Sequence, residues 1–284
     1  MKIIVLAAGS GKRMWPIGQD KCLIPFLGKP LLYHNLKKIK DALNPLDFII
    51  VGRPQSKEAI EEVIKTLEIK ATIVIQNQSL GMADAILAAK DLIEGEILIV
   101  NAEDILDAKI FKAVLAVKAE VVVTGLTMDS YFPGGYIKAT GNRVEGIVEK
   151  PGEGNEPSNM VKLVVDYFKD GKGLISYLEK AKSQLDDVYE VALGAMITGG
   201  VDIKVTKYDG VWIPLKYSWQ ILDITAYFLS QIEQQISPSA KVAKTAIIEG
   251  SVVIEEGVRV FEGVVIKGPC YIGKNCIVGN NSMV

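Results

Sequence analysis

Short apolar segments alternate with segments of helical periodicity through the first half of the chain. Five segments have the length and the Ile- and Val-rich composition of buried strands; they are Lys2–Leu6, Asp47–Val51, Ala71–Ile75, Glu96–Val100 and Glu120–Leu126. Four segments between them place apolar residues at helical spacing; they are Pro30–Leu43, Gln55–Leu67, Met82–Ile93 and Ala108–Lys118. This alternation predicts an α/β domain with a Rossmann-like, mostly parallel sheet and helices on both faces. Ligands of such sheets bind at the carboxyl ends of the strands, so we expect a site around the loop after Leu6.

The pattern changes between residues 131 and 172, where Gly, Pro and Asn are more frequent. This composition predicts an insertion of strands and loops that forms one wall of a pocket. Helical periodicity returns afterwards, in Gly173–Lys182, Tyr189–Ile197 and Ser218–Gln235. We therefore expect the first domain to occupy residues 1–235.

A six-residue repeat begins after Pro238. Branched apolar residues recur in one register at Val242, Ile248, Ile254, Val260, Ile266, Ile272, Val278 and Val284. Repeats of this period are typical of a parallel β-helix, and a chance run of Val and Ile would not hold the register. We expect a short left-handed β-helix over residues 236–284, incomplete at Val284. An open final coil predicts a homo-oligomer, a trimer or a dimer, that assembles through the β-helix.

Composition narrows the classes of partner. The 284 residues are 49% hydrophobic with a formal net charge of −2. So small a net charge argues against nucleic acid as a partner, and the charge of an anionic substrate would have to be neutralised by residues at its own binding site. No apolar run reaches membrane-spanning length, so we expect no membrane partner. Three cysteines without metal-site spacing favour a reducing, cytoplasmic location. His34, the one histidine, lies on a predicted helix and is interpreted as structural.

The loop after the first strand is rich in small residues and is followed by two cations, Arg13 and Lys21. Small residues let backbone N–H groups approach an anion, which predicts phosphate binding. A dinucleotide-binding loop is excluded because Met14 stands where the third glycine belongs, and a P-loop is excluded because Lys12 is followed by Arg13. The alternative is a tight turn with ordinary surface cations.

The wider stretch, Leu6 to Pro30, resembles the sugar-phosphate nucleotidylyltransferases, such as glucose-1-phosphate thymidylyltransferases and N-acetylglucosamine-1-phosphate uridylyltransferases. The matching pieces are Leu6–Met14, Pro16, Lys21, Leu23, Pro25 and Gly28–Pro30, and Asp20 replaces a proline. The resemblance implies attack by a sugar 1-phosphate on the α-phosphorus of a nucleoside triphosphate, with pyrophosphate as leaving group. It covers the whole chain with decreasing quality.

Site residues follow from the same resemblance. It implies that Arg13 and Lys21 are catalytic and that Gln76 reads the edge of uracil or thymine, since a glutamine amide both donates and accepts. The nucleotide-binding residues that it implies are Leu6, Ala7, Ala8, Gly9, Ser10, Gly11, Gln76 and Gly81. The sugar-phosphate residues that it implies are Gly135, Glu149 and Lys150.

The metal positions depart from the family pattern. A Mg²⁺ ion is implied at Glu103, with Asp104 beside it. The family has Gly-Asp where this chain has Ala102-Glu103, and the longer glutamate moves the carboxylate in a site that demands octahedral geometry. Pro214 stands where the second metal aspartate belongs and cannot ligate through its side chain. On the sugar side, Lys162 and Val164 replace an expected asparagine and glycine.

Three functions remain open. The first is a sugar-1-phosphate nucleotidylyltransferase that uses UTP or dTTP, and the second is a catalytically impaired relative that binds nucleotide or nucleotide sugar as a regulatory or structural subunit. Because Glu103 and Pro214 stand at the metal positions, the sequence does not decide between an active enzyme and an impaired one. The third, an acyltransferase on the β-helix, is disfavoured because the repeats contain no histidine base.

Overall fold

The computed structural model describes residues 1–9, 11–44 and 47–284, without the side chain of Lys12. The chain divides into two compact units. The first unit comprises residues 1–24 and 31–215, and the second comprises residues 25–30 and 216–284. The last helix before the repeats therefore groups with the β-helix, whereas the sequence analysis placed it in the first domain.

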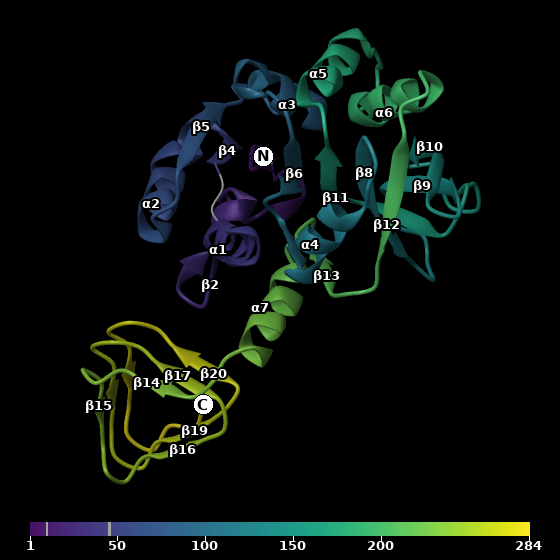
Figure 1. Ribbon diagram of the computed structural model, residues 1–284. Coiled ribbons are helices and arrows are strands. Elements are labelled where there is room, and N and C mark those ends of the chain that lie inside the picture. The colour runs from purple at the N-terminus through teal and green to yellow at the C-terminus, as the bar shows by residue number, and fades with distance from the viewer. Residues whose placement is uncertain (10, 45–46) are drawn as a thin grey trace. The chain divides into compact units, whose positions relative to one another are not determined.

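The first unit is built on one nine-stranded sheet (Figure 1), in the order β5-β4-β1-β6-β11-β8-β12-β10-β9. Strands β5, β4, β1 and β6 run parallel to one another, as do β8 and β12, while β11 runs antiparallel to its neighbours. The strands are β1 (Lys2–Leu6), β4 (Asp47–Gly52), β5 (Ala71–Ile75), β6 (Ile97–Asn101), β8 (Val121–Thr127), β9 (Gly135–Thr140), β10 (Arg143–Glu149), β11 (Met160–Phe168) and β12 (Ile203–Tyr208). The mostly parallel α/β sheet is confirmed.

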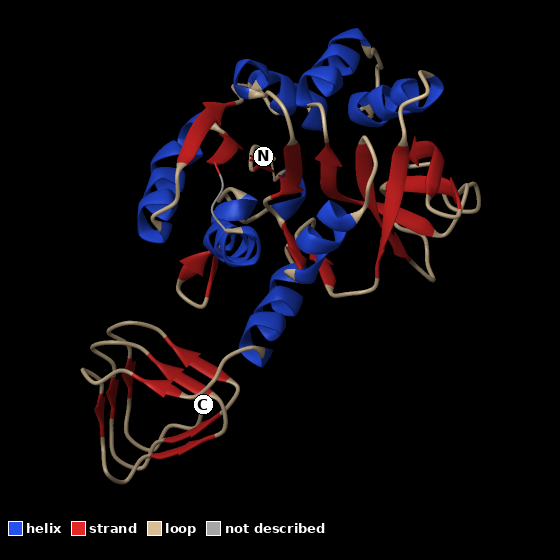
Figure 2. Ribbon diagram, viewed as in Figure 1, coloured by secondary structure: helices blue, strands red, loops and turns tan. Residues whose placement is uncertain are grey.

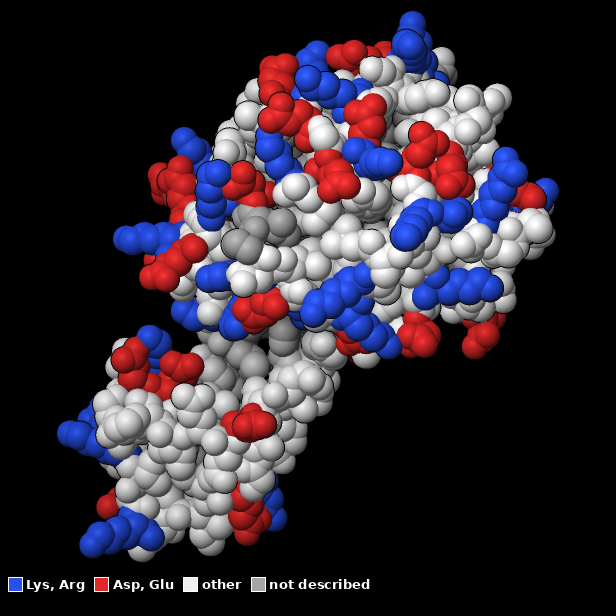
Figure 3. Space-filling view, in the orientation of Figure 1, with Lys and Arg blue, Asp and Glu red and all other residues white. Residues whose placement is uncertain are grey.

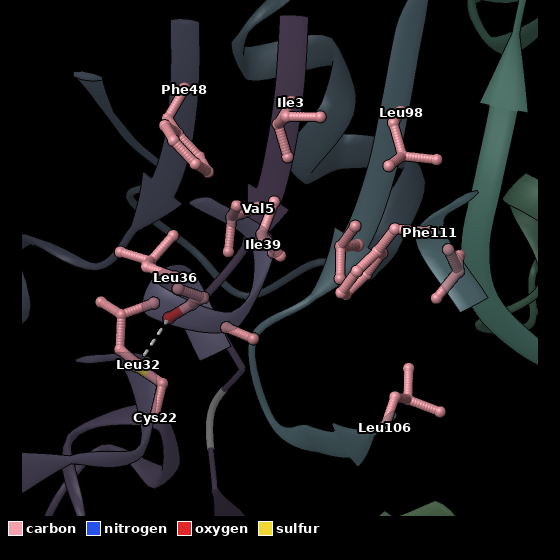
Figure 4. Close-up of a cluster of buried hydrophobic side chains, with 14 of the residues drawn as sticks. Ile3, Val5, Cys22, Leu32, Leu36, Ile39, Phe48, Leu98, Leu106 and Phe111 are labelled. Atoms are coloured by element: carbon pink, nitrogen blue, oxygen red, sulfur yellow. Dashed lines mark hydrogen bonds between the residues drawn. The ribbon is translucent and has the colours of Figure 1, made fainter. Parts of the chain in front are cut away.

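Helices cover both faces of this sheet (Figure 2). The helices of the first unit are α1 (Leu31–Leu43), α2 (Lys57–Leu67), α3 (Met82–Ala88), α4 (Lys109–Ala116), α5 (Gly171–Lys180) and α6 (Val188–Thr198). Alternate residues of a strand point to opposite faces, so Ile3 and Val5 pack with α1, α2 and α4, while Ile4 and Leu6 pack with α3, α5 and α6. Figure 4 shows the first of these clusters, in which the thiol of Cys22 donates to the Ala7 carbonyl oxygen at 3.7 Å.

Strand β11 corrects the sequence analysis, which expected residues 131–172 to form only a wall of the pocket. This strand lies at the centre of the sheet, between β6 and β8. The sequence did not indicate this central position because β11 carries Lys162 and Asp166, and ionisable residues are rare in a fully buried strand. The two side chains neutralise each other in an ion pair of 2.5 Å, which allows the strand to be buried.

Short elements complete the first unit. Strand β7 (Asp104–Leu106) pairs antiparallel with β13 (Trp212–Pro214), a pairing that the sequence analysis did not predict. Single turns of 3-10 helix are formed by Lys12–Met14, Lys21–Leu23, Pro54–Ser56 and Lys90–Leu92. The turn Lys90–Leu92 follows α3 as a separate element, so the predicted helix Met82–Ile93 consists of two elements.

The second unit contains a hairpin, one helix and the repeats. Its first elements are β2 (Pro25–Phe26), β3 (Lys29–Pro30) and α7 (Gln220–Ser230), followed by β14 (Gln235–Ile236), β15 (Lys241–Val242), β16 (Ile247–Glu249), β17 (Val252–Ile254), β18 (Arg259–Val260), β19 (Val265–Lys267), β20 (Cys270–Ile272) and β21 (Ile277–Val278). Helix α7 ends five residues before the predicted Gln235, where the first repeat strand begins.

The repeats form a parallel β-helix in which each coil comprises three strands and spans 18 residues, as the pairings Val252 with Cys270 and Arg259 with Ile277 show. The inward ladder is the predicted one, including Ile254, Val260 and Ile266. Cys276 is exposed, whereas Val258, 18 residues earlier at the equivalent position of the neighbouring coil, is buried.

Candidate active site

The loop after β1 lies where three strands end together. The Ala7 N–H donates to the Val51 carbonyl oxygen of β4 at 2.8 Å, and the Ala102 N–H, just after β6, donates to the Leu6 carbonyl oxygen at 3.0 Å. The predicted residues Leu6, Ala7 and Ala8 are buried. Ser10, predicted in the same loop, lies outside the described residues, and Gly11 begins the turn that carries Arg13.

Gly9 is adjacent to the carboxylate of Glu103. A Cβ atom added to Gly9 would lie 2.5 Å from Glu103 Oε1, so any side chain at this position would collide with the carboxylate. The absence of a side chain at Gly9 therefore allows a charged group from β6 to reach the loop. The structure thus brings together two regions that the sequence analysis placed at one edge of the sheet.

Glu103 forms an ion pair with Lys21, and both side chains are largely buried. Burial raises the pKa of Glu103, and the Lys21 ammonium opposes this rise without cancelling it. Next to this pair, Asp20 accepts from Arg53 Nη1 at 2.6 Å. Asp20 is the residue that replaces a proline of the family pattern, and Arg53 on the neighbouring loop neutralises it.

The backbone around Glu103 is held by a residue that the sequence analysis missed. The Asn35 side chain, on α1 and 6% exposed, donates to the carbonyl oxygens of Ala102 at 2.8 Å and Asp104 at 3.1 Å. A polar amide on the buried face of an amphipathic helix could have indicated this role. The Leu215 N–H also donates to the Glu103 carbonyl oxygen at 3.1 Å.

A magnesium ion does not fit these residues in the way that the resemblance implies. The Glu103 carboxylate already binds the Lys21 ammonium, and Pro214 lies opposite Asp104 in the pairing of β13 with β7. Within residues 1–9, 11–44 and 47–284, no three His, Cys, Asp or Glu side chains are grouped so that they could hold a metal ion. Magnesium at Glu103 and Asp104 stays a prediction.

Gln76 and Gly81 lie beside the loop. Ser79 donates to the Ala8 carbonyl oxygen at 2.8 Å, which joins the segment after β5 to the loop after β1. Gln76 is 3% exposed, and its amide nitrogen donates to the Gly81 carbonyl oxygen at 3.2 Å and to Asp84 at 2.7 Å. The protein thus holds the amide nitrogen of Gln76 in place.

Gly81 has a positive φ of 96°, and the space that a Cβ would need is filled by Asp186. The residue therefore has to be glycine. Asp186 also acts electrostatically on Lys150, together with Glu190, so its charge influences both the segment after β5 and the segment after β10.

The predicted sugar-phosphate residues lie together at the start of β9 and the end of β10. Gly135 and Glu149 are direct cross-strand partners, and Lys150 Nζ lies 2.9 Å from Glu149 Oε1. Burial lowers the pKa of Lys150, but the hydrogen bond to Glu149 and the nearby carboxylates outweigh it, so that the pKa is raised. Gly135, Glu149 and Lys150 therefore form one group.

A buried cluster beneath this group was not predicted. Lys162 pairs with Asp166, the Tyr189 hydroxyl donates to the same Asp166 oxygen at 2.8 Å, and the ammonium lies 5.0 Å from the centre of the Tyr189 ring. Burial raises the pKa of neighbouring Glu190 to about 7, Lys162 opposes the rise, and Glu149 adds to it. The lysine that departs from the family pattern thus has partners on both β11 and α6.

Figure 3 shows Lys and Arg side chains interspersed with Asp and Glu over the visible face of the first unit.

The chain belongs to the nucleotidyl transferase family, whose model matches residues 2–213. A second model, the six-repeat bacterial transferase hexapeptide, matches residues 251–284. Both matches agree with the α/β unit and the β-helix described above.

Curated relatives specify the family further. The bifunctional protein GlmU of Methanococcus maripaludis is 29% identical over 257 residues, which are 88% of this chain and 59% of that protein. A bifunctional sugar-1-phosphate nucleotidylyltransferase/acetyltransferase of Sulfurisphaera tokodaii is 27% identical, over 88% of this chain and 62% of the relative. The chain thus spans about three fifths of the length of these relatives.

Solved structures share the fold. A putative glucose-1-phosphate thymidylyltransferase from Bacillus anthracis superimposes with a TM-score of 0.68 and 18% identity, covering 80% of this chain and 94% of that one. The inositol-1-phosphate CTP transferase of T. maritima gives a TM-score of 0.67 and 17% identity, with 81% and 96% covered.

We searched the described helices for a membrane span, and none of them combines the necessary length and apolar character.

Proposed function

We propose that this chain transfers a nucleotidyl group from UTP or dTTP to a sugar 1-phosphate and releases pyrophosphate. The observation that carries the proposal is the hydrogen bond that joins Ser79 to the loop after β1, with Gly81 close to Asp186 and with Lys150 paired to Glu149 under the influence of the same Asp186 charge. A nucleotide bound at the loop and a sugar phosphate bound at Lys150 would place the reacting groups between these two segments.

In the proposed reaction, an oxygen of the sugar phosphate bonds to the α-phosphorus while the bond to the β-phosphate oxygen breaks. Such a transfer needs alignment and charge neutralisation more than covalent chemistry. Backbone N–H groups of the loop and the Arg13 guanidinium would neutralise the triphosphate, and Lys150 would hold the sugar phosphate. Glu149 would accept from sugar hydroxyls, and the Gln76 amide oxygen would accept the N3–H of a pyrimidine.

A second candidate function is a catalytically impaired subunit that binds nucleotide or nucleotide sugar. The ion pair between Lys21 and Glu103, together with Pro214 opposite Asp104, favours it. The two functions share the same nucleotide contacts and differ in turnover.

The test is a pyrophosphate-release assay across nucleoside triphosphates and sugar 1-phosphates. We expect release with UTP or dTTP, weaker release with purine triphosphates, and a loss of about 100-fold in Arg13→Ala, since charge neutralisation carries the reaction. Arg143→Ala, a change on exposed β10, is the matched control. Nucleotide binding without pyrophosphate release for any pair would establish the second candidate, and no nucleotide binding would contradict both.

We also propose that the chain acts in the cytoplasm as a homo-oligomer assembled through its β-helix. Its cysteines, Cys22, Cys270 and Cys276, are all free thiols, which suits a reducing compartment. An outward ladder of Ile247, Val265 and Met283 on neighbouring coils supports assembly, because two of these side chains are 50% and 74% exposed.

A further inference from the structure

The Glu103 side chain lies against the loop at Gly9, and its two carboxylate oxygens have different neighbours. Oε2 accepts from the Lys21 ammonium, and Oε1 abuts the backbone at Gly9. The Glu103 side chain is 9% exposed and that of Lys21 is 11% exposed. This carboxylate therefore has a cation of its own, supplied by the chain.

A divalent ion at Glu103 would have to displace the ammonium or share the carboxylate with it. Displacement would leave a largely buried lysine without a counterion, which is costly. Sharing would place two cations on one carboxylate whose side chain is only 9% exposed. The second expected carboxylate is missing, since Pro214 has no side-chain ligand.

We infer that the Lys21 ammonium takes the place of a divalent metal at Glu103, so that the site needs no magnesium to bind a nucleoside triphosphate. The identity of the cation follows from the contacts at Glu103 alone. The nucleotide part rests on the proposed function.

The same ion pair determines which groups remain to contact the phosphates. Lys21 is neutralised by Glu103, so the charge that meets the triphosphate comes from the loop N–H groups and Arg13. Replacing Glu103 with glutamine would remove one negative charge beside the phosphates and release the charge of Lys21. We expect Glu103→Gln to bind UTP about tenfold more tightly without metal, a gain that follows from the size of one nearby charge interaction.

The first experiment titrates the full chain with Mn²⁺, followed by electron paramagnetic resonance, without nucleotide. We expect wild type, Glu103→Gln and the exposed control Glu153→Gln to bind Mn²⁺ equally weakly. A wild-type Mn²⁺ site that is lost in Glu103→Gln and kept in Glu153→Gln would overturn the inference. This experiment does not depend on nucleotide binding.

The second experiment measures UTP binding to wild type by calorimetry, with Mg²⁺ and with EDTA, and needs no variant that might fail to fold. We expect dissociation constants that agree within about twofold, because the phosphates would be met by the chain's own cations. Binding that is tenfold tighter with Mg²⁺ would overturn the inference. No UTP binding in either buffer would overturn the proposed function and the nucleotide part, while the Mn²⁺ titration would still decide which cation Glu103 carries.

Discussion

The carboxyl group of Glu190 titrates close to neutral pH because it is buried near other charges. Burial raises its pKa from an ordinary value of 4.5 to about 7, and the positive charge of Lys162 limits the rise. A carboxyl group whose pKa is higher in the folded state holds more protons folded than unfolded between these two values. Stability is then greatest below about pH 4.5 for this group and is lost as the pH rises towards 7.

We predict that deprotonation of Glu190 lowers the unfolding free energy by at most about 3 kcal/mol as the pH rises from 4.5 to 7. Glu190→Gln should flatten the profile over this interval, since the amide does not titrate. Urea denaturation at pH 5, 6, 7 and 8 measures it, with the exposed Glu62→Gln as control. A wild-type profile that Glu190→Gln leaves unchanged would show that another group sets the slope.

Gln76 provides a second prediction at this scale. Because its amide nitrogen is held by Gly81 and Asp84, its oxygen is the group left to accept the N3–H of a pyrimidine. Gln76→Ala should weaken UTP binding about tenfold and leave ATP binding almost unchanged, the size expected for one hydrogen bond to a base. Calorimetry with both nucleotides tests this, and an equal loss for UTP and ATP would indicate a structural role instead.

Among the elements, β11 and α6 depend on one another through buried charge. Lys162 and Asp166 lie on β11, and Tyr189 reaches Asp166 from α6. Removing one member of a buried ion pair is far more damaging than removing both, because the remaining charge stays buried without a partner. The cluster thus holds β11 in the sheet and α6 against it.

We predict that Lys162→Met lowers the unfolding free energy by about 3–5 kcal/mol. The double variant Lys162→Met with Asp166→Asn should recover a large part of that loss, since it leaves no charge behind. Chemical denaturation of both variants, with Lys138→Met on exposed β9 as control, measures the difference. A double variant as unstable as the single one would contradict the ion-pair explanation.

At the scale of the whole molecule, the β-helix presents faces of different character. Ile247, Val265 and Met283 stack in one row, with the pair Glu249 and Lys267 on the same strands, whereas Lys241, Arg259 and Ile277 stack on another face. A row of apolar side chains over parallel strands is a surface that a second copy of the chain could cover. This surface is the basis for the assembly proposed above.

We predict that Val265→Lys converts the oligomer into a monomer, because a lysine in the middle of the ladder would be buried without a counterion. Lys241→Glu, on the charged face, should leave the mass unchanged. Light scattering coupled to size-exclusion chromatography measures all three proteins. A monomeric wild type, or an oligomer that persists in Val265→Lys, would rule out assembly through this ladder.

Local sequence determined much of the fold. Periodicity located β1 and β5 at their observed bounds and the β-helix by its six-residue register, since both depend on which residues are buried rather than on distant partners. The loop after Leu6 was recognisable for a similar reason, because small residues and cations follow one another directly in the chain. Gly135, Glu149 and Lys150, which the resemblance to the family singled out, lie together in the fold, and their role in binding a sugar phosphate stays a prediction.

Tertiary structure decided what local pattern could not express. Strand β11 looked like part of a loop-rich insertion because its buried charges depend on a partner from another element: Tyr189 of α6 donates to Asp166, 23 residues away in the sequence. The surroundings of Glu103 depend on the fold in the same way, since Lys21 and Glu103 lie 82 residues apart and only the fold brings them together. The sequence by itself therefore determined the fold class and the family, whereas contacts between distant segments, which only the folded chain creates, decided which side chains surround Glu103.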